Sequence, residues 1–139
     1  MKIKAIELII EESRGKTLSF LYKIFQKYLY PVYYEPRLKD DFVHFLFTLI
    51  RDNQLKLAKN GKFLEGGLDD KIEYVRKEWH ENYNFQCKNF FYDTYGAVII
   101  NTDNDNWWDD KSGFQAVWIM EDGSLKWATK EDNQIANRD

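Results

Sequence analysis

The sequence has few of the residues that bind metals or form disulfides. Its 139 residues include one cysteine, Cys87, and two histidines, His44 and His80. A single cysteine excludes a disulfide within the chain, and we interpret Cys87 as a buried, inert thiol. Zinc held by His80 and Cys87 would need carboxylates from distant segments, so we predict no metal site. His44 stands between apolar residues of a helical pattern, and we expect it to be a partly buried structural residue.

The sequence also lacks long apolar runs and the short motifs of common enzymes. No apolar run approaches the roughly 20 residues of a membrane-spanning helix, and residues 1–12 lack the apolar core of a signal peptide. We therefore expect a soluble, cytoplasmic protein that does not bind membranes. The glycines form neither a GxGxxG nor a Walker pattern, and no nucleophile stands at a diagnostic spacing from a base. We expect neither enzymatic activity nor a cofactor.

The composition is that of a folded domain. Hydrophobic residues make up 44% of the chain and aromatic residues 17%, which argues against disorder. The length predicts one domain over residues 1–139, and the polar end, residues 130–139, is expected to fray.

Helical periodicity dominates the first half of the chain. Apolar residues recur at helical spacing in four segments, and the predicted helices are residues 3–13, residues 17–30 with Thr17 as the cap, residues 37–52, and a segment from Asp69 or Asp70 to about His80.

Short strands dominate the second half. Two β-prone runs flank Asp122-Gly123 between Gly113 and Thr129, and this pattern predicts a hairpin. A second tight turn is predicted at Asn60-Gly61. We expect the run Val98–Ile100 to pair with the Gly123 hairpin in one small antiparallel sheet, and Phe90–Tyr92 to form an additional strand. This order predicts an α+β fold, with N-terminal helices packed on a small antiparallel sheet formed mainly by the C-terminal half.

Acidic residues are concentrated in the C-terminal half. The net charge is −3 overall but −6 for residues 70–139. Residues 101–122 contain one lysine, Lys111, and six acids: Asp103, Asp105, Asp109, Asp110, Glu121 and Asp122. The spacing lacks the glycine and the final glutamate of a calcium-binding loop, so we interpret residues 101–112 as a solvated acidic loop. Such a segment repels phosphate backbones and attracts cationic protein surfaces.

Trp107 and Trp108 lie inside this acidic segment, and their position leaves two interpretations. Both rings could cap the edge of the sheet and pack on helices. Alternatively, at least one ring lies on the surface as an aromatic anchor surrounded by carboxylates, which suits an interface with a basic partner. On the second interpretation, the partner-binding residues are the six acids together with Trp107 and Trp108.

Two blocks resemble a family of small bacterial proteins with a domain of unknown function: Leu55–Gly66, followed by Ile72, Arg76 and Trp79, and Ala116–Trp127. Members of that family are similar to immunity proteins found beside polymorphic toxin genes, including those of contact-dependent growth inhibition. The resemblance implies a protein without catalytic residues that binds and neutralises the C-terminal domain of a cognate toxin. Many such toxins are nucleases with a basic surface.

A nucleic-acid-binding module is the alternative function. The helix 37–52 is followed by a hairpin that carries Lys56, Lys59 and Lys62, an arrangement loosely similar to a helix with a wing. The negative net charge disfavours this alternative, and we therefore expect a protein partner and no nucleic acid.

Overall fold

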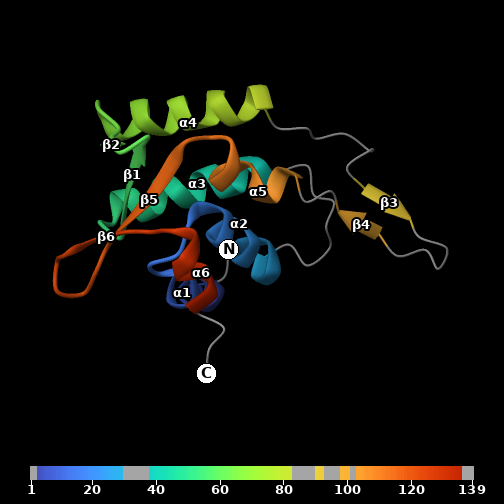
Figure 1. The fold of residues 1–139 in the computed structure, drawn as a ribbon, viewed down its shortest axis with the longest axis horizontal. Coiled ribbons are helices and arrows are strands. Elements are labelled where there is room, and N and C mark those ends of the chain that lie inside the picture. The colour runs from blue at the N-terminus through green and yellow to red at the C-terminus, as the bar shows by residue number, and fades with distance from the viewer. Residues whose placement is uncertain (1–2, 30–37, 83–89, 93–97, 101–102, 136–139) are drawn as a thin grey trace.

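The protein has an α+β architecture, as its sequence predicts (Figure 1). The computed structural model describes residues 3–29, 38–82, 90–92, 98–100 and 103–135. The helices are α1 (Ile3–Ser13), α2 (Leu18–Leu29), α3 (Leu38–Arg51), α4 (Leu68–Asn82), α5 (Asp103–Asp110) and α6 (Lys130–Ile135). The strands are β1 (Leu55–Lys59), β2 (Lys62–Phe63), β3 (Phe90–Tyr92), β4 (Val98–Ile100), β5 (Phe114–Ile119) and β6 (Leu125–Trp127).

The first four helices follow the periodicity of the sequence. In α3, two acids in the first turn suit the positive end of the helix dipole. Its buried side chains recur on one face of the helix: Phe42, Val43, Phe45, Leu46 and Leu49. Thr17 caps α2 as predicted, because its Oγ1 accepts a hydrogen bond from the Phe20 amide at 3.4 Å.

Two hairpins form a four-stranded antiparallel sheet in the order β2-β1-β5-β6. The β1–β2 turn has positive φ angles at Asn60 (51°) and Gly61 (87°), and the β5–β6 turn has one at Gly123 (86°). Asn and Gly adopt these angles at little cost, so both predicted turns are confirmed. The hairpins join through β1 and β5, whose five-residue register runs from Leu55 opposite Trp118 to Lys59 opposite Phe114.

The predicted partner of the Gly123 hairpin is wrong. The run Val98–Ile100 is a strand, β4, but it pairs with β3 in a separate two-stranded sheet. β3 confirms the additional strand expected at Phe90–Tyr92. The central position beside β5 is taken by β1, which provides a longer register and buries Leu55 and Leu57 against the helices.

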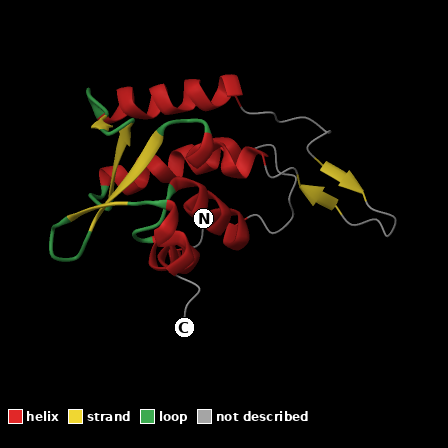
Figure 2. Cartoon of the chain, in the orientation of Figure 1, coloured by secondary structure: helices red, strands yellow, loops and turns green. Residues whose placement is uncertain are grey.

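The helices lie beside the four-stranded sheet (Figure 2), and an aromatic cluster fills the core between them. The ring of Trp79 lies 4.8 Å from that of Trp108 and 5.4 Å from that of Tyr22, between centroids. Trp79, Phe45 and Trp118 are fully buried, as predicted.

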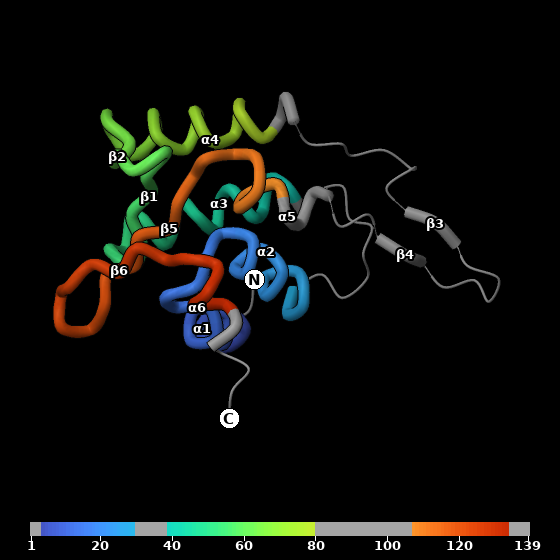
Figure 3. The backbone as a smooth tube through the Cα atoms, in the orientation of Figure 1, coloured from blue at the N-terminus to red at the C-terminus, as the bar shows by residue number. Residues whose placement is uncertain are grey.

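The C-terminal segment contains a helix within residues 130–139, the stretch that the sequence predicts to fray. Residues 130–135 form α6, whose chain returns to the α1–α2 turn (Figure 3). The side-chain amide of Asn133 donates to Thr17 Oγ1 at 2.8 Å, and its Oδ1 accepts from the Thr17 amide at 3.1 Å. Residues 136–139 lie outside the described residues.

Candidate partner-binding surfaces

The acidic segment expected to be a loop is a helix. Residues 103–110 form α5, and the amide of Lys111 donates to the Trp107 carbonyl at 3.0 Å as the chain leaves it. Asp and Asn have low helix propensity, which is why the pattern favours a loop. Packing of an apolar face supplies most helix stability in proteins, and here two tryptophans supply that face.

Trp107 and Trp108 belong to the core. Their exposed fractions are 5% and 0%, and the rings lie 4.9 Å apart in an edge-to-face arrangement. Adjacent residues of a helix point about 100° apart, so both rings fit the broad apolar face of a helix, although they could not share one side of an extended loop. The interpretation of a surface anchor at Trp107 or Trp108 is therefore wrong, and their packing on helices is confirmed.

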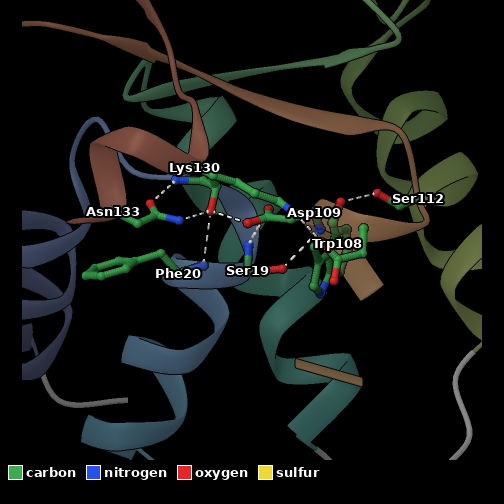
Figure 4. Close-up of polar contacts among 9 residues, drawn as sticks. Ser19, Phe20, Trp108, Asp109, Ser112, Lys130 and Asn133 are labelled. Carbon is green, nitrogen blue, oxygen red and sulfur yellow. Dashed lines mark hydrogen bonds and ion pairs between the residues drawn. The ribbon is translucent and has the colours of Figure 1, made fainter. Parts of the chain in front are cut away.

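The two acids at the end of α5 have different surroundings. Asp109 is half-buried and binds the start of α2: its carboxylate accepts from the Thr17 hydroxyl at 2.6 Å and from the Ser19 amide at 3.1 Å (Figure 4). Asp110 is exposed and forms an ion pair with Lys130 at 2.5 Å. The side chains of Asp103 and Asp105 lie outside the described part of the structure. Asp109 is thus engaged inside the fold, while Asp110 stays at the surface.

The other two predicted acids lie at the β5–β6 turn. Glu121 and Asp122 are both exposed. Asp122 accepts from the hydroxyl and the amide of Ser124, and these hydrogen bonds lower the pKa of its carboxyl. The six residues of β5 separate this turn from α5, a distance of about 20 Å. Glu121 and Asp122 therefore do not share one patch with Asp109 and Asp110, although the four acids are close in sequence.

The register assigns each side chain of the sheet to one of two faces. Directly opposed residues project to the same face, as do residues two apart along a strand. Because Val117 is opposite both Lys56 and Trp127, its face carries the following side chains: Lys56, Ala58, Phe63, Gln115, Val117, Ile119, Leu125 and Trp127. We call this the outer face. The inner face carries the strand residues of the core: Leu55, Leu57, Phe114, Ala116 and Trp118.

The outer face carries exposed apolar side chains. Phe63 and Leu125 are each 43% exposed, and Trp127 is half-buried. The rings of Phe63 and Trp127 meet at 5.1 Å between centroids, although they belong to the two edge strands. Flat strands would hold those edges about 14 Å apart, so the two rings lean toward each other over the curved sheet. They shield Val117 and Ala58, which are fully buried.

Helices and the α1–α2 turn contact the inner face. Trp118 donates its indole N–H to the Lys16 carbonyl at 2.8 Å, and the Phe114 ring lies 6.1 Å from the Trp108 ring. None of the outer-face residues belongs to the core that the described helices share with the sheet. The Glu121–Asp122 turn borders the outer face, because it directly follows the opposed pair Ile119 and Leu125. An apolar, aromatic surface beside carboxylates thus exists, with Trp127 and Phe63 in place of Trp107 and Trp108.

A sequence signal for this surface was available. β5 is almost continuously apolar, a pattern typical of strands with apolar contacts on both faces. Leu125 and Trp127 also alternate with Lys126, which indicates that they share one face. The choice between the two faces depends on where the helices pack, and this is absent from the strand sequences.

The lysines of the first hairpin do not form one row. Lys56 lies on the outer face with its Nζ 5.5 Å from the Phe63 centroid. Lys59 belongs to the other face, where its Nζ contacts Glu78 at 2.9 Å and the Tyr74 hydroxyl at 3.0 Å. Lys62 is directly opposite Lys59 and so projects to the same face as Lys59. The nucleic-acid alternative needs the three lysines on one basic surface, whereas they lie on two opposite faces of the sheet.

His44 is exposed, which corrects the expectation of a partly buried residue. It falls between the core positions of α3 and stacks on Phe47 with ring centroids 6.0 Å apart. Both side chains line an open pocket of about 350 Å³ between α3 and α4, together with Asp69, Ile72, Glu73 and Arg76.

No group of three His, Cys, Asp or Glu side chains among the described residues could hold a metal ion. None of the described helices is both long and apolar enough to cross a bilayer.

Comparison with known proteins assigns a family to the part of the chain that contains both hairpins. No curated protein and no solved structure matches the chain. The family DUF596, described as proteins of unknown function, matches residues 50–128, a span that begins at the end of α3 and includes all six strands that the structure describes. This span is more than half of the chain, and the protein therefore belongs to the DUF596 family.

Proposed function

We propose that this protein is an immunity protein that binds and neutralises a cognate toxin domain through the outer face of its sheet. The observation that carries the proposal is the apolar group of exposed Phe63 and Leu125 with half-buried Trp127, on a face that the helical core does not use. Contiguous exposed apolar patches are typical of protein interfaces, and tryptophan is enriched among the residues that dominate binding energy.

The aromatic pair provides a preformed contact surface. Trp127 and Phe63 already pack against each other in the free protein. Their rotamers are therefore partly fixed before binding, which reduces the entropy lost on association. The adjacent Leu125 extends the apolar surface toward the turn.

The charge of the molecule favours a basic partner. Glu121 and Asp122 border the apolar group, and Asp110, Asp103 and Asp105 belong to α5 at the other end of β5. Acidic groups near an interface accelerate association with a cationic surface and select against anionic partners. A nuclease domain, whose active region is basic, fits this description. The protein inhibits by covering or distorting that region, without chemistry of its own.

The proposal is tested with the C-terminal domain of the protein encoded immediately upstream of this one. Cells that express this domain should stop growing, and coexpression of the DUF596 protein should restore growth. Trp127→Ala should weaken the complex by about 2 kcal/mol, roughly thirtyfold, mainly through faster dissociation. Tyr74→Ala is the control, because Tyr74 is an exposed aromatic residue (42%) on α4 and does not belong to the outer face.

A second pair of variants tests the charge. Glu121→Lys should slow association and reduce its dependence on salt, whereas Glu131→Lys on α6, also exposed, should leave the rate close to that of the wild type. Circular dichroism confirms the fold of each variant. Unchanged affinity in Trp127→Ala would remove the outer face from the interface, and failure of the wild type to restore growth would contradict the proposed function.

A further inference from the structure

β6 is an edge strand with hydrogen-bonding groups directed away from the sheet. The Met120 amide donates to the Ser124 carbonyl at 2.8 Å, and the Ala128 amide donates to the Ala116 carbonyl at 3.0 Å. In an antiparallel ladder only alternate residues bond to the neighbouring strand, so these two bonds fix which residues of β6 face β5. Lys126 is the residue between them that faces β5. The amides and carbonyls of Leu125 and Trp127 therefore point to the open edge.

The same two residues place their side chains on the outer face. The edge and the apolar surface are thus continuous, and one extended segment could contact both. β6 is only three residues long, and the Lys126 side chain lies on the opposite face, where it forms an ion pair with Asp132 at 3.1 Å. β6 also contains no proline.

We infer that the partner contributes an extended segment that pairs with β6 and continues the four-stranded sheet. The inference rests on the proposed function and specifies how the partner binds. Main-chain hydrogen bonds to Leu125 and Trp127 fix the segment at the edge, and its alternate apolar side chains pack beside theirs on the outer face. A lysine or arginine at the end near Glu121 and Asp122 completes the match of charge.

A second copy of this chain fits the edge less well. The β6 strands of two copies could pair antiparallel about a two-fold axis. Only an axis at Lys126 gives hydrogen-bond partners to the outward groups of both Leu125 and Trp127. It sets the Lys126 side chains of the two copies directly opposite each other, and like charges in that position are destabilising. A partner segment has no such constraint.

Amide hydrogen exchange of the wild-type protein tests the inference, measured by NMR with and without the upstream-encoded C-terminal domain. The amides of Leu125 and Trp127 should exchange at least about tenfold more slowly in the complex. The Lys126 amide, already bonded to β5, is the internal control and should change little. A complex that restores growth but leaves the Leu125 and Trp127 amides unprotected would overturn strand addition and keep the proposed function. Protection that rises with protein concentration in the absence of the partner would assign the edge to a second copy and overturn the inference.

A pair of substitutions at Leu125 separates the backbone from the side chain. Leu125→Ala removes the apolar contact and keeps the amide, whereas Leu125→Pro also removes the outward N–H at an edge position that tolerates proline. Leu125→Pro should dissociate about tenfold faster than Leu125→Ala. Equal dissociation rates for two folded variants would overturn the main-chain bond at Leu125. If the wild type forms no complex, both the proposed function and this inference fail.

Discussion

The two faces of the four-stranded sheet are built from similar residues but differ in how deeply those residues are buried. Trp118 on the inner face is fully buried and donates its indole N–H to the Lys16 carbonyl. Trp127 on the outer face is half-buried and meets only one other described ring, that of Phe63. The difference comes from the helices: α2, α3 and α5 pack against β1 and β5 on one side. A tryptophan in a short strand is thus a core residue or a surface residue according to what its face meets.

The same division applies to charged groups. Asp109 and Asp110 are neighbours in α5, yet the first holds the start of α2 and the second forms an exposed ion pair. Lys39 and Lys56 both lie over aromatic rings, Lys39 over Trp79 at 5.6 Å and Lys56 over Phe63 at 5.5 Å. In each pair, the first residue packs within the helical part of the fold and the second is closer to solvent.

The largest expected effect concerns the tryptophans. Trp118→Ala should reduce the free energy of unfolding by about 3 to 5 kcal/mol, because it leaves a cavity in the core and removes a hydrogen bond. Trp127→Ala should cost only about 1 kcal/mol, since its ring is partly solvated in the folded state. Urea denaturation of both variants measures the difference. Equal losses would mean that the outer face is as closed as the inner face.

The next effect concerns the acids of α5. Asp109→Ala should reduce the free energy of unfolding by about 1 to 2 kcal/mol, because the amide of Ser19 and the hydroxyl of Thr17 lose their acceptor. Asp110→Ala is the matched control, and its loss should be too small to measure because exposed ion pairs contribute little. Thermal denaturation of both variants at one pH is the measurement. A larger loss for Asp110→Ala would reverse their assigned roles.

The smallest effect is a pH dependence from Lys39. Burial lowers the pKa of its ammonium from 10.5 to about 8; Asp40 opposes this shift, while Arg76 adds to it. The unfolded chain therefore binds more protons than the folded protein between about pH 8 and pH 10.5, so the contribution of Lys39 to stability rises with pH across that range.

Lys39→Met should remove this contribution, so the unfolding free energy of the variant should rise less with pH than that of the wild type. Lys56→Met keeps Lys39 and is the control, and it should retain the slope of the wild type. The measurement is urea denaturation at several values between pH 7.5 and pH 10. A slope that persists in Lys39→Met would assign the titration to another group.

Local sequence features predicted the helices, strands and turns better than they predicted which strands pair with each other. The turns at Asn60-Gly61 and Gly123 were predictable because positive φ angles demand particular residues. α3 was predictable because its apolar residues repeat at helical spacing. The pairing of β5 was not, since β1 and β4 are both short strands and the choice between them depends on contacts distant in sequence.

The candidate site shows the same limit. The sequence by itself determined a protein rich in aromatic residues, with an acidic C-terminal half and two tight hairpins. It could not decide which tryptophans reach the surface. Trp107 and Trp108 are buried because residues 103–110 form a helix that packs on α2, and Trp127 remains partly exposed because no described helix packs over the outer face. Turn geometry depends on a few neighbouring residues and can be predicted from the sequence. Burial depends on how the helices and the sheet pack, so only the tertiary structure shows that the exposed aromatic surface lies on the sheet and not on α5.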